Sequence, residues 1–175
     1  MDTRSPGGLF ARHRRWMYRD GRPNWLARSL NRFAARQFSV GWAPRNWVTL
    51  EVPGRRTGRT VEVPVVVADH GGGRYLVSML GEDANWVRNV RAAGGRAVLR
   101  HGDREQVRLD EVPEAERAPI LRRYLALAPG ARAHLPVDRH APVAEFAPIA
   151  ARYPVFRIIP GPTPPAAGAG GAQAH

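Results

Sequence analysis

Three arginines crowd a six-residue turn, "GRRTGR" at residues 54–59, which lies between two runs of β-branched residues. A glycine-containing turn exposes backbone N–H groups, and the hydroxyl of Thr57 can donate a hydrogen bond beside them. Guanidinium groups such as those of Arg55 and Arg56 bind phosphate or carboxylate oxygens through paired hydrogen bonds. The turn lacks the spacing of a Walker P-loop and of the dinucleotide-binding glycine motif. It therefore predicts either an anion site of another kind or a surface hairpin with ordinary arginines.

A second segment, "VSMLGEDANWVRNV" at residues 77–90, combines groups that suit a flat ligand. Ser78 lies near the end of a predicted strand and Gly81 permits a close approach, while Trp86 and Asn89 lie three residues apart on one face of a predicted helix. Free N–H groups at a helix start can receive an anion or a ring carbonyl. A tryptophan can flank a heteroaromatic ring. The alternative for Trp86 is burial in the core.

Two histidines, His134 and His140, lie in a predicted loop with Asp138 between them. A histidine that titrates near neutrality suits the transfer of a proton, although both side chains could equally belong to the loop surface. Their spacing matches no zinc signature, so we predict no metal site.

The elements that must position these residues are mostly strands. Alternating and β-branched runs predict six of them, at residues 46–52, 60–69, 74–80, 96–102, 104–112 and 154–160. Helices are predicted within the intervening segments 81–95, 113–130 and 142–153, and Pro119 is expected to break or offset the second. Because most strands follow one another in hairpins, we expect an antiparallel sheet that closes its edges as a small barrel. The fold class is α+β, or all-β with added helices.

The charge of the chain is concentrated near its start. All 27 basic residues are arginine, the net charge is +12, and residues 1–60 hold 13 arginines against three acidic residues. Such asymmetry indicates an anionic partner: a phosphorylated ligand, a nucleic acid or a membrane surface. No nucleic-acid-binding motif accompanies the arginines, so we predict no specific nucleic-acid partner. The absence of cysteine excludes disulfides, thiolate zinc sites and cysteine nucleophiles.

Composition divides the chain into three parts. Residues 1–22 form a basic arm, residues 23–160 the barrel domain, and residues 161–175 a Pro/Gly/Ala tail that is predicted to be disordered. The domain begins with a predicted amphipathic helix at 24–38, which either covers the core or binds an anionic membrane through its arginine face. No apolar run has the roughly 20 residues that cross a bilayer. We therefore expect a cytoplasmic protein, or one peripheral at the inner face of the cell membrane.

Together, the arginine turn and the 77–90 segment resemble the deazaflavin-dependent nitroreductase and quinone reductase family of actinobacteria. The resemblance is carried by "GRRTG" after a strand, the proline of "VEVPVVV", a glycine-containing loop after "YLVS", and "NWVRNVRA" before another strand. It is specific over residues 47–101 and looser over 46–159. It implies a split β-barrel that binds the reduced deazaflavin coenzyme F420. It also implies an oxidoreductase that passes a hydride from this cofactor to a quinone, a nitroaromatic or another small unsaturated acceptor.

The resemblance implies roles for individual residues as well. The cofactor-binding positions are those of the turn, the following strand, the loop beside the ring and the helix that closes over it: Gly54, Arg55, Arg56, Thr57, Gly58, Arg59, Pro64, Val65, Ser78, Met79, Leu80, Gly81, Trp86 and Asn89. The candidate catalytic residues are Ser78, which could polarise a carbonyl, and His134, which could supply a proton.

The sequence departs from the family at three positions near these sites. Val61 stands where a basic residue is common, and Glu82 and Asp83 stand in a loop that is usually basic or Gly-Gly. The two carboxylates would repel an anion unless they point away or pair with arginines. Two other functions fit the same barrel: a non-catalytic binder of lipid or another anionic amphiphile, and an FMN-binding protein. The chain is expected to act as a monomer or a homodimer.

Overall fold

The computed structural model describes residues 44–161, together with residues 18–19 and 22–23. The latter form a two-stranded pair, β1 (Tyr18–Arg19) and β2 (Arg22–Pro23). The predicted helix at 24–38, most of the basic arm and the tail beyond residue 161 lie outside the described residues.

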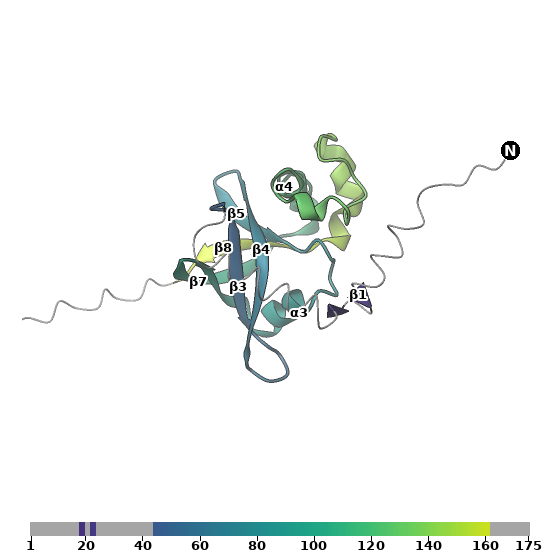
Figure 1. The fold of residues 1–175 in the computed structure, drawn as a ribbon. Coiled ribbons are helices and arrows are strands. Elements are labelled where there is room, and N and C mark those ends of the chain that lie inside the picture. The colour runs from purple at the N-terminus through teal and green to yellow at the C-terminus, as the bar shows by residue number, and fades with distance from the viewer. Residues whose placement is uncertain (1–17, 20–21, 24–43, 162–175) are drawn as a thin grey trace, which may run out of the picture.

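Six strands form a closed antiparallel barrel in the order β3-β4-β5-β8-β7-β6 (Figure 1). Their bounds are β3 Trp47–Pro53, β4 Thr60–His70, β5 Gly73–Val77, β6 Arg96–His101, β7 Asp103–Glu111 and β8 Val155–Pro160. The barrel closes because β3 pairs with β4 on one side and with β6 on the other. The predicted α+β split barrel of six antiparallel strands with peripheral helices is confirmed.

Glycines with positive φ make the tightest of the hairpin connections. Gly71 and Gly72, which form the two-residue turn between β4 and β5, have φ of +54° and +75°. A two-residue turn with positive φ at both positions follows the right-handed twist of the flanking strands. Gly102, between β6 and β7, has φ of +78°. The hairpins therefore form where the sequence placed its glycines.

The helices lie in the two longer connections (Figure 1). α3 (Asn85–Ala92) links β5 to β6, and α4 (Glu114–Leu127) with the 3-10 helices η1 (Pro129–Ala131) and η2 (Val143–Arg152) links β7 to β8. α4 packs against β4 and η2. None of the helices in the described part of the chain is both long and apolar enough to cross a membrane.

Pro119 does not break the second predicted helix. α4 runs through it to Leu127, and the residues on either side, Ala118 and Ile120, are buried. A proline removes one backbone hydrogen bond from a helix interior. The burial of these neighbours against the barrel offsets that loss, so tertiary packing decides the outcome here.

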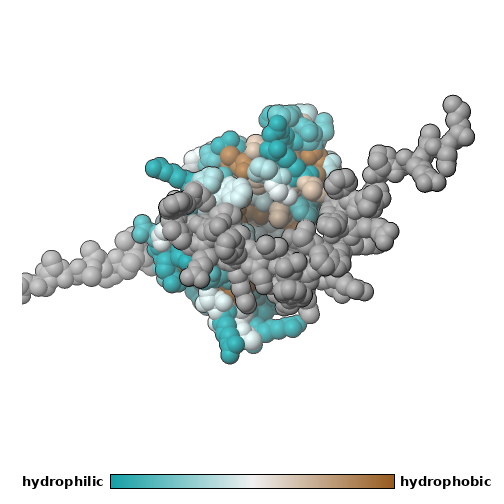
Figure 2. Space-filling model, viewed as in Figure 1, coloured by the Kyte–Doolittle hydropathy of each residue, from teal (hydrophilic) through white to brown (hydrophobic). Residues whose placement is uncertain are grey.

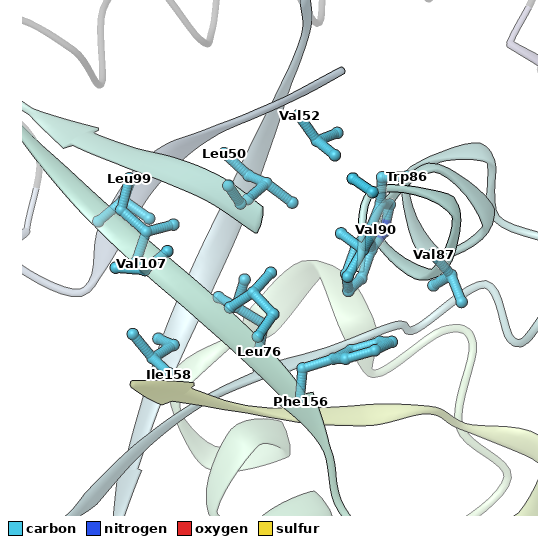
Figure 3. Close-up of a cluster of buried hydrophobic side chains, with 14 of the residues drawn as sticks. Leu50, Val52, Leu76, Trp86, Val87, Val90, Leu99, Val107, Phe156 and Ile158 are labelled. Atoms are coloured by element: carbon cyan, nitrogen blue, oxygen red, sulfur yellow. The ribbon is translucent and has the colours of Figure 1, made fainter. Parts of the chain in front are cut away.

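Two hydrophobic clusters stabilise the fold. The first fills the barrel and is closed by α3, whose Trp86 and Val90 lie with Phe156 and Leu76 in Figure 3. The second lies between the β4–β5 sheet region and the α4–η2 layer, and Phe146 is its largest buried member from η2. The apolar side chains of α3 are thus anchored in the barrel core, and this anchoring fixes the position of the polar face of the helix.

Candidate functional site

The 54–59 turn is closed by its own backbone. The Gly54 N–H donates to the Arg59 carbonyl at 2.8 Å, and the Gly58 N–H donates to the Gly54 carbonyl at 2.8 Å. A Cβ at position 54 would lie 3.1 Å from the Arg59 carbonyl oxygen and 3.3 Å from Cγ2 of Val61. Gly58 has φ of +68°. Both glycines are therefore required by the shape of the turn, which leaves Arg55, Arg56 and Arg59 exposed around it.

Arg55 joins this turn to α3. Its backbone N–H and its Nη1 donate to Oδ1 of Asn89 at 3.3 and 2.9 Å. Its Nη1 and Nη2 also reach Oδ1 of Asn85, both at 3.5 Å. Asn85 and Asn89 are four residues apart and so share one face of the helix. The turn and the start of α3, 30 residues apart in the sequence, form one unit.

A groove of about 240 Å³ lies between the turn and the helix. Its lining comes from the turn, β4 and α3: Gly54, Arg55, Arg56, Thr57, Val61, Asn85 and Asn89. Four of the predicted turn residues and Asn89 are thereby brought together, and Val61 lies beside them. Figure 2 shows the end of the molecule that carries the β3–β4 turn as a hydrophilic projection.

The groove is electropositive. Within the described residues, the guanidinium groups of Arg56 and Arg59 make no ion pair or hydrogen bond. The carboxylates of the adjoining strands are already engaged, Glu51 by Arg100 and Arg104 and Glu62 by Arg100. Uncompensated cations at a concave site attract anions.

Glu82 and Asp83 do not line the groove. Glu82 pairs with Arg91 at 3.4 Å, and Asp83 pairs with Arg88. Both partners belong to α3, and neither lines the groove. The repulsion that these carboxylates could exert on an anion is thus reduced by arginines of the neighbouring helix.

Several predicted positions lie outside the groove lining. Gly58 and Arg59 belong to the turn, and Pro64 and Val65 are half-buried on β4, with Val65 packed against the barrel core. The loop after β5 contains a half-buried Met79 and an exposed Leu80, whose exposed fraction of 42% makes it the one exposed large hydrophobic residue of the described part.

The third strand is shorter than predicted. It ends at Val77 instead of Leu80, because the chain turns at Ser78. The buried Ser78 hydroxyl donates to the Gly81 carbonyl at 2.7 Å, and the Ser78 N–H donates to the Pro154 carbonyl at 2.9 Å. Gly81 has φ of +79°, and a Cβ there would lie 3.1 Å from the Arg152 carbonyl oxygen. Ser78 and Gly81 therefore fix the shape of this loop.

Trp86 packs into the barrel. Its exposed fraction is 8%, and its ring lies 5.5 Å from that of Phe156 between centroids, at an interplanar angle of 58° (Figure 3). It contributes nothing to the groove lining. The structure thus places this side chain in the core, the alternative that the sequence had left open.

The histidines belong to the α4–η2 side of the molecule. The carbonyl of His134, which follows η1, accepts a hydrogen bond from the Tyr153 hydroxyl at 2.8 Å. His140 is exposed, and its N–H donates to Asp138. Neither histidine lines the groove between the turn and α3.

Glu111 connects α3 to the α4–η2 layer. Its carboxylate accepts hydrogen bonds from Arg91 of α3 at 2.7 and 2.9 Å and from Arg117 of α4 at 3.2 Å. Arg117 is buried and also donates to the Val112 and Ala150 carbonyls. The helix that borders the groove is therefore anchored on two sides, by the barrel core and by Glu111.

This anchor gives a pH-dependent contribution to stability. The hydrogen bonds from Arg91 hold the pKa of Glu111 below its ordinary value of 4.5, against the opposing effect of burial. A group whose pKa is lowered on folding stabilises the protein above its unfolded pKa and loses that contribution as the pH falls through its folded pKa. We expect Glu111→Gln to lower the urea midpoint of unfolding at pH 7. At pH 3 the urea midpoints of the variant and the unsubstituted protein should differ less. An equal difference in urea midpoint at both pH values would contradict this account.

Asn85 is the groove residue that the sequence did not indicate as a ligand. Its contact with Arg55 depends on how α3 sits against the barrel. Its spacing of four from Asn89 was the available signal, because that spacing puts two amides on one helix face.

Comparison with known protein families identifies the family of this chain. The model of F420H(2)-dependent quinone reductases matches residues 26–146, more than half of the chain. No curated protein sequence matches this chain significantly.

Three similar solved structures show modest likeness. One described as a domain-swapped dimer is 16% identical over 77% of this chain and 97% of its own, with a TM-score of 0.47. An F420-H2 dependent reductase (FDR-A) is 22% identical over 66% of this chain and 95% of its own, with a TM-score of 0.43. A heme binding protein from Mycobacterium smegmatis is 16% identical over 71% of this chain and 50% of its own, with a TM-score of 0.46. The family assignment rests on the sequence match alone: the chain belongs to the F420H(2)-dependent quinone reductases, oxidoreductases whose cofactor is reduced coenzyme F420.

Proposed function

We propose that this protein transfers a hydride from reduced coenzyme F420 to a quinone, a nitroaromatic or another small unsaturated acceptor. The observation that carries the proposal is the groove between the arginine turn and α3, in which two arginines and two amides converge.

The groove fits the anionic part of such a cofactor. Gly54 keeps the floor of the turn free of a side chain, and Arg56 has no ion-pair or hydrogen-bond partner among the described residues. A volume of about 240 Å³ falls below the roughly 300–1,000 Å³ of pockets that enclose a whole drug-sized ligand. The groove therefore suits a phosphate with its nearest substituents, while the ring would lie beyond it.

In this proposal the residues of the protein bind the cofactor and orient it toward the acceptor. When bound, reduced F420 supplies the hydride, so the protein has to hold the two reactants in contact and keep competing reactions away. Arg55 and Arg56 would bind the phosphate oxygens in pairs, with Thr57 beside them. Pro64 and Val65 on β4, and the loop from Ser78 to Gly81, would face the ring. Trp86 would act indirectly, by holding α3 in place.

The proton that follows the hydride needs a separate source. The Ser78 hydroxyl already donates to Gly81, so in this proposal Ser78 shapes the loop instead of protonating the acceptor. His134 stays the candidate donor because an imidazole can act as a general acid. Leu80, exposed within this loop, would offer the acceptor an apolar contact.

Oxidation of reduced F420 by candidate acceptors tests this function. Purified protein would be mixed with reduced F420 and either menadione or a nitroaromatic compound, and the return of the absorbance of oxidised F420 would be followed. Turnover that scales with protein concentration supports the proposal. Tight binding of F420 without turnover of any acceptor would restrict the function to cofactor binding. Co-purified flavin absorbance or acyl chains would favour the FMN-binding or lipid-binding alternative instead.

A further inference from the structure

Arg55 is held differently from the arginines of the described part that pair with a carboxylate. Arg74, Arg91, Arg100 and Arg123 are each bonded to a carboxylate, from Glu105, Glu111, Glu51 and Asp69 respectively. The guanidinium of Arg55 is bonded to the amide oxygens of Asn85 and Asn89. An amide oxygen accepts a hydrogen bond without carrying a charge. Arg55 is thus oriented and retains its full positive charge.

The arginines of α3 pair with carboxylates, whereas the side chains that this helix offers to Arg55 are uncharged amides. Arg88 and Arg91 pair with Asp83, Glu82 and Glu111, and none of these carboxylates lines the groove. The face of the same helix that meets the turn presents Asn85 and Asn89 instead. A carboxylate at either position would hold Arg55 more strongly, but it would compete with an incoming anion for the same guanidinium.

We propose that Asn85 is a positioning residue for anion binding, acting with Asn89 to orient the Arg55 guanidinium at the groove without neutralising it. The ligand class is a phosphate ester. This inference rests on the proposed function for the identity of that ester, namely the F420 phosphate. Arg55 makes the contact with the anion, and Asn85 acts through Arg55.

The isosteric variant Asn85→Asp separates this role from a structural one. An acidic side chain in the first turn of a helix favours folding through the helix dipole. If Asn85 served only the helix, Asn85→Asp would leave F420 affinity unchanged and would maintain or raise the melting temperature. We expect instead that the melting temperature is maintained or raised while the Kd for F420 rises about tenfold, the effect of losing one charge-assisted contact. Asn85→Ala should raise the Kd by about threefold, a small effect because its contacts with Arg55 are long, at 3.5 Å, and because Asn89 still holds the guanidinium.

Two controls make the test specific. Gln106→Glu introduces the same charge by the same isosteric change at an exposed position outside the groove, and should leave the Kd unchanged. Arg55→Ala should abolish most of the effect of Asn85→Asp, because a residue that acts through Arg55 has no role once Arg55 is gone. An undiminished effect in the Arg55→Ala background would overturn the proposal by showing direct repulsion of the anion.

The measurements are titrations of F420 fluorescence and, in parallel, thermal shifts with inorganic pyrophosphate. If F420 does not bind but pyrophosphate stabilises the protein and the variants follow the expected order, the proposed function fails and the role of Asn85 stands. If F420 binds and Asn85→Asp binds equally well, the role of Asn85 is refuted and the function stands. Binding of neither probe would refute the anion site itself.

Discussion

Replacing both groove arginines, in the variant Arg55→Ala/Arg56→Ala, should weaken F420 binding by at least about 100-fold. A hydrogen bond to a charged group is worth about 1.5–3 kcal/mol, and two such contacts at the lower bound give about 3 kcal/mol, which is two powers of ten in Kd. The loss should come with a smaller dependence of Kd on salt, because fewer screened charges take part. Fluorescence titration of F420 at two salt concentrations measures both effects.

A matched control separates these contacts from net charge. Arg122→Ala/Arg157→Ala removes the same two charges from exposed positions on α4 and β8, where neither guanidinium has an ion-pair partner among the described residues. This control should bind F420 with an affinity close to that of the unsubstituted protein. If both double variants lost affinity equally, general electrostatic attraction would explain the binding and the groove would have no specific role.

Most of the barrel was predictable because short sequence patterns mark its strands and the hairpins that join them. Each strand is an alternating or β-branched run, and glycine pairs such as Gly71-Gly72 mark the hairpins that join them. Closure follows from β3 pairing with β6, a contact between segments about 50 residues apart, and was inferred only from the need to cover sheet edges. The end of β5 was misplaced by three residues because the hydrogen bond from Ser78 to Gly81 competes with the strand.

The lining of the groove was predictable where its residues are consecutive in the sequence, but not where residues come together across the fold. The residue types of the turn indicated a candidate anion site, and four of these residues line the groove. The contribution of Asn85 depends on α3 being fixed so that its amide reaches Arg55, 30 residues away in sequence. Nor could the sequence show that Glu82 and Asp83 would pair with Arg91 and Arg88, because the two carboxylates lie in the loop before α3 and their partners follow nine and five residues later.

Trp86 illustrates why a helix face does not reveal its partner. It lies three residues from Asn89, and both side chains are buried, yet one faces the barrel core and the other the groove. Periodicity identifies the inner face of a helix but not which layer covers each part of it. The two possible roles of this residue predict different outcomes when it is replaced.

We expect Trp86→Ala to destabilise the protein by about 3–5 kcal/mol, the usual cost of deleting a large aromatic side chain from a core. Because that is a large part of a typical unfolding free energy of roughly 5–15 kcal/mol, Trp86→Phe provides a milder variant that keeps an aromatic ring near Phe156. Trp86→Phe should lower the urea midpoint while binding F420 with nearly unchanged affinity.

The pair with Phe156 gives a second measure of this role. In a double-mutant cycle of Trp86→Leu and Phe156→Leu, the two rings should show a coupling of about 0.5–1.5 kcal/mol in unfolding free energy. The opposite pattern, in which Trp86→Phe leaves the urea midpoint unchanged but raises the Kd for F420 tenfold, would place the indole against the cofactor. The 8% exposure of Trp86 and its contact with Phe156 favour the first outcome, because a side chain enclosed by the core can reach a ligand only through the helix that it holds.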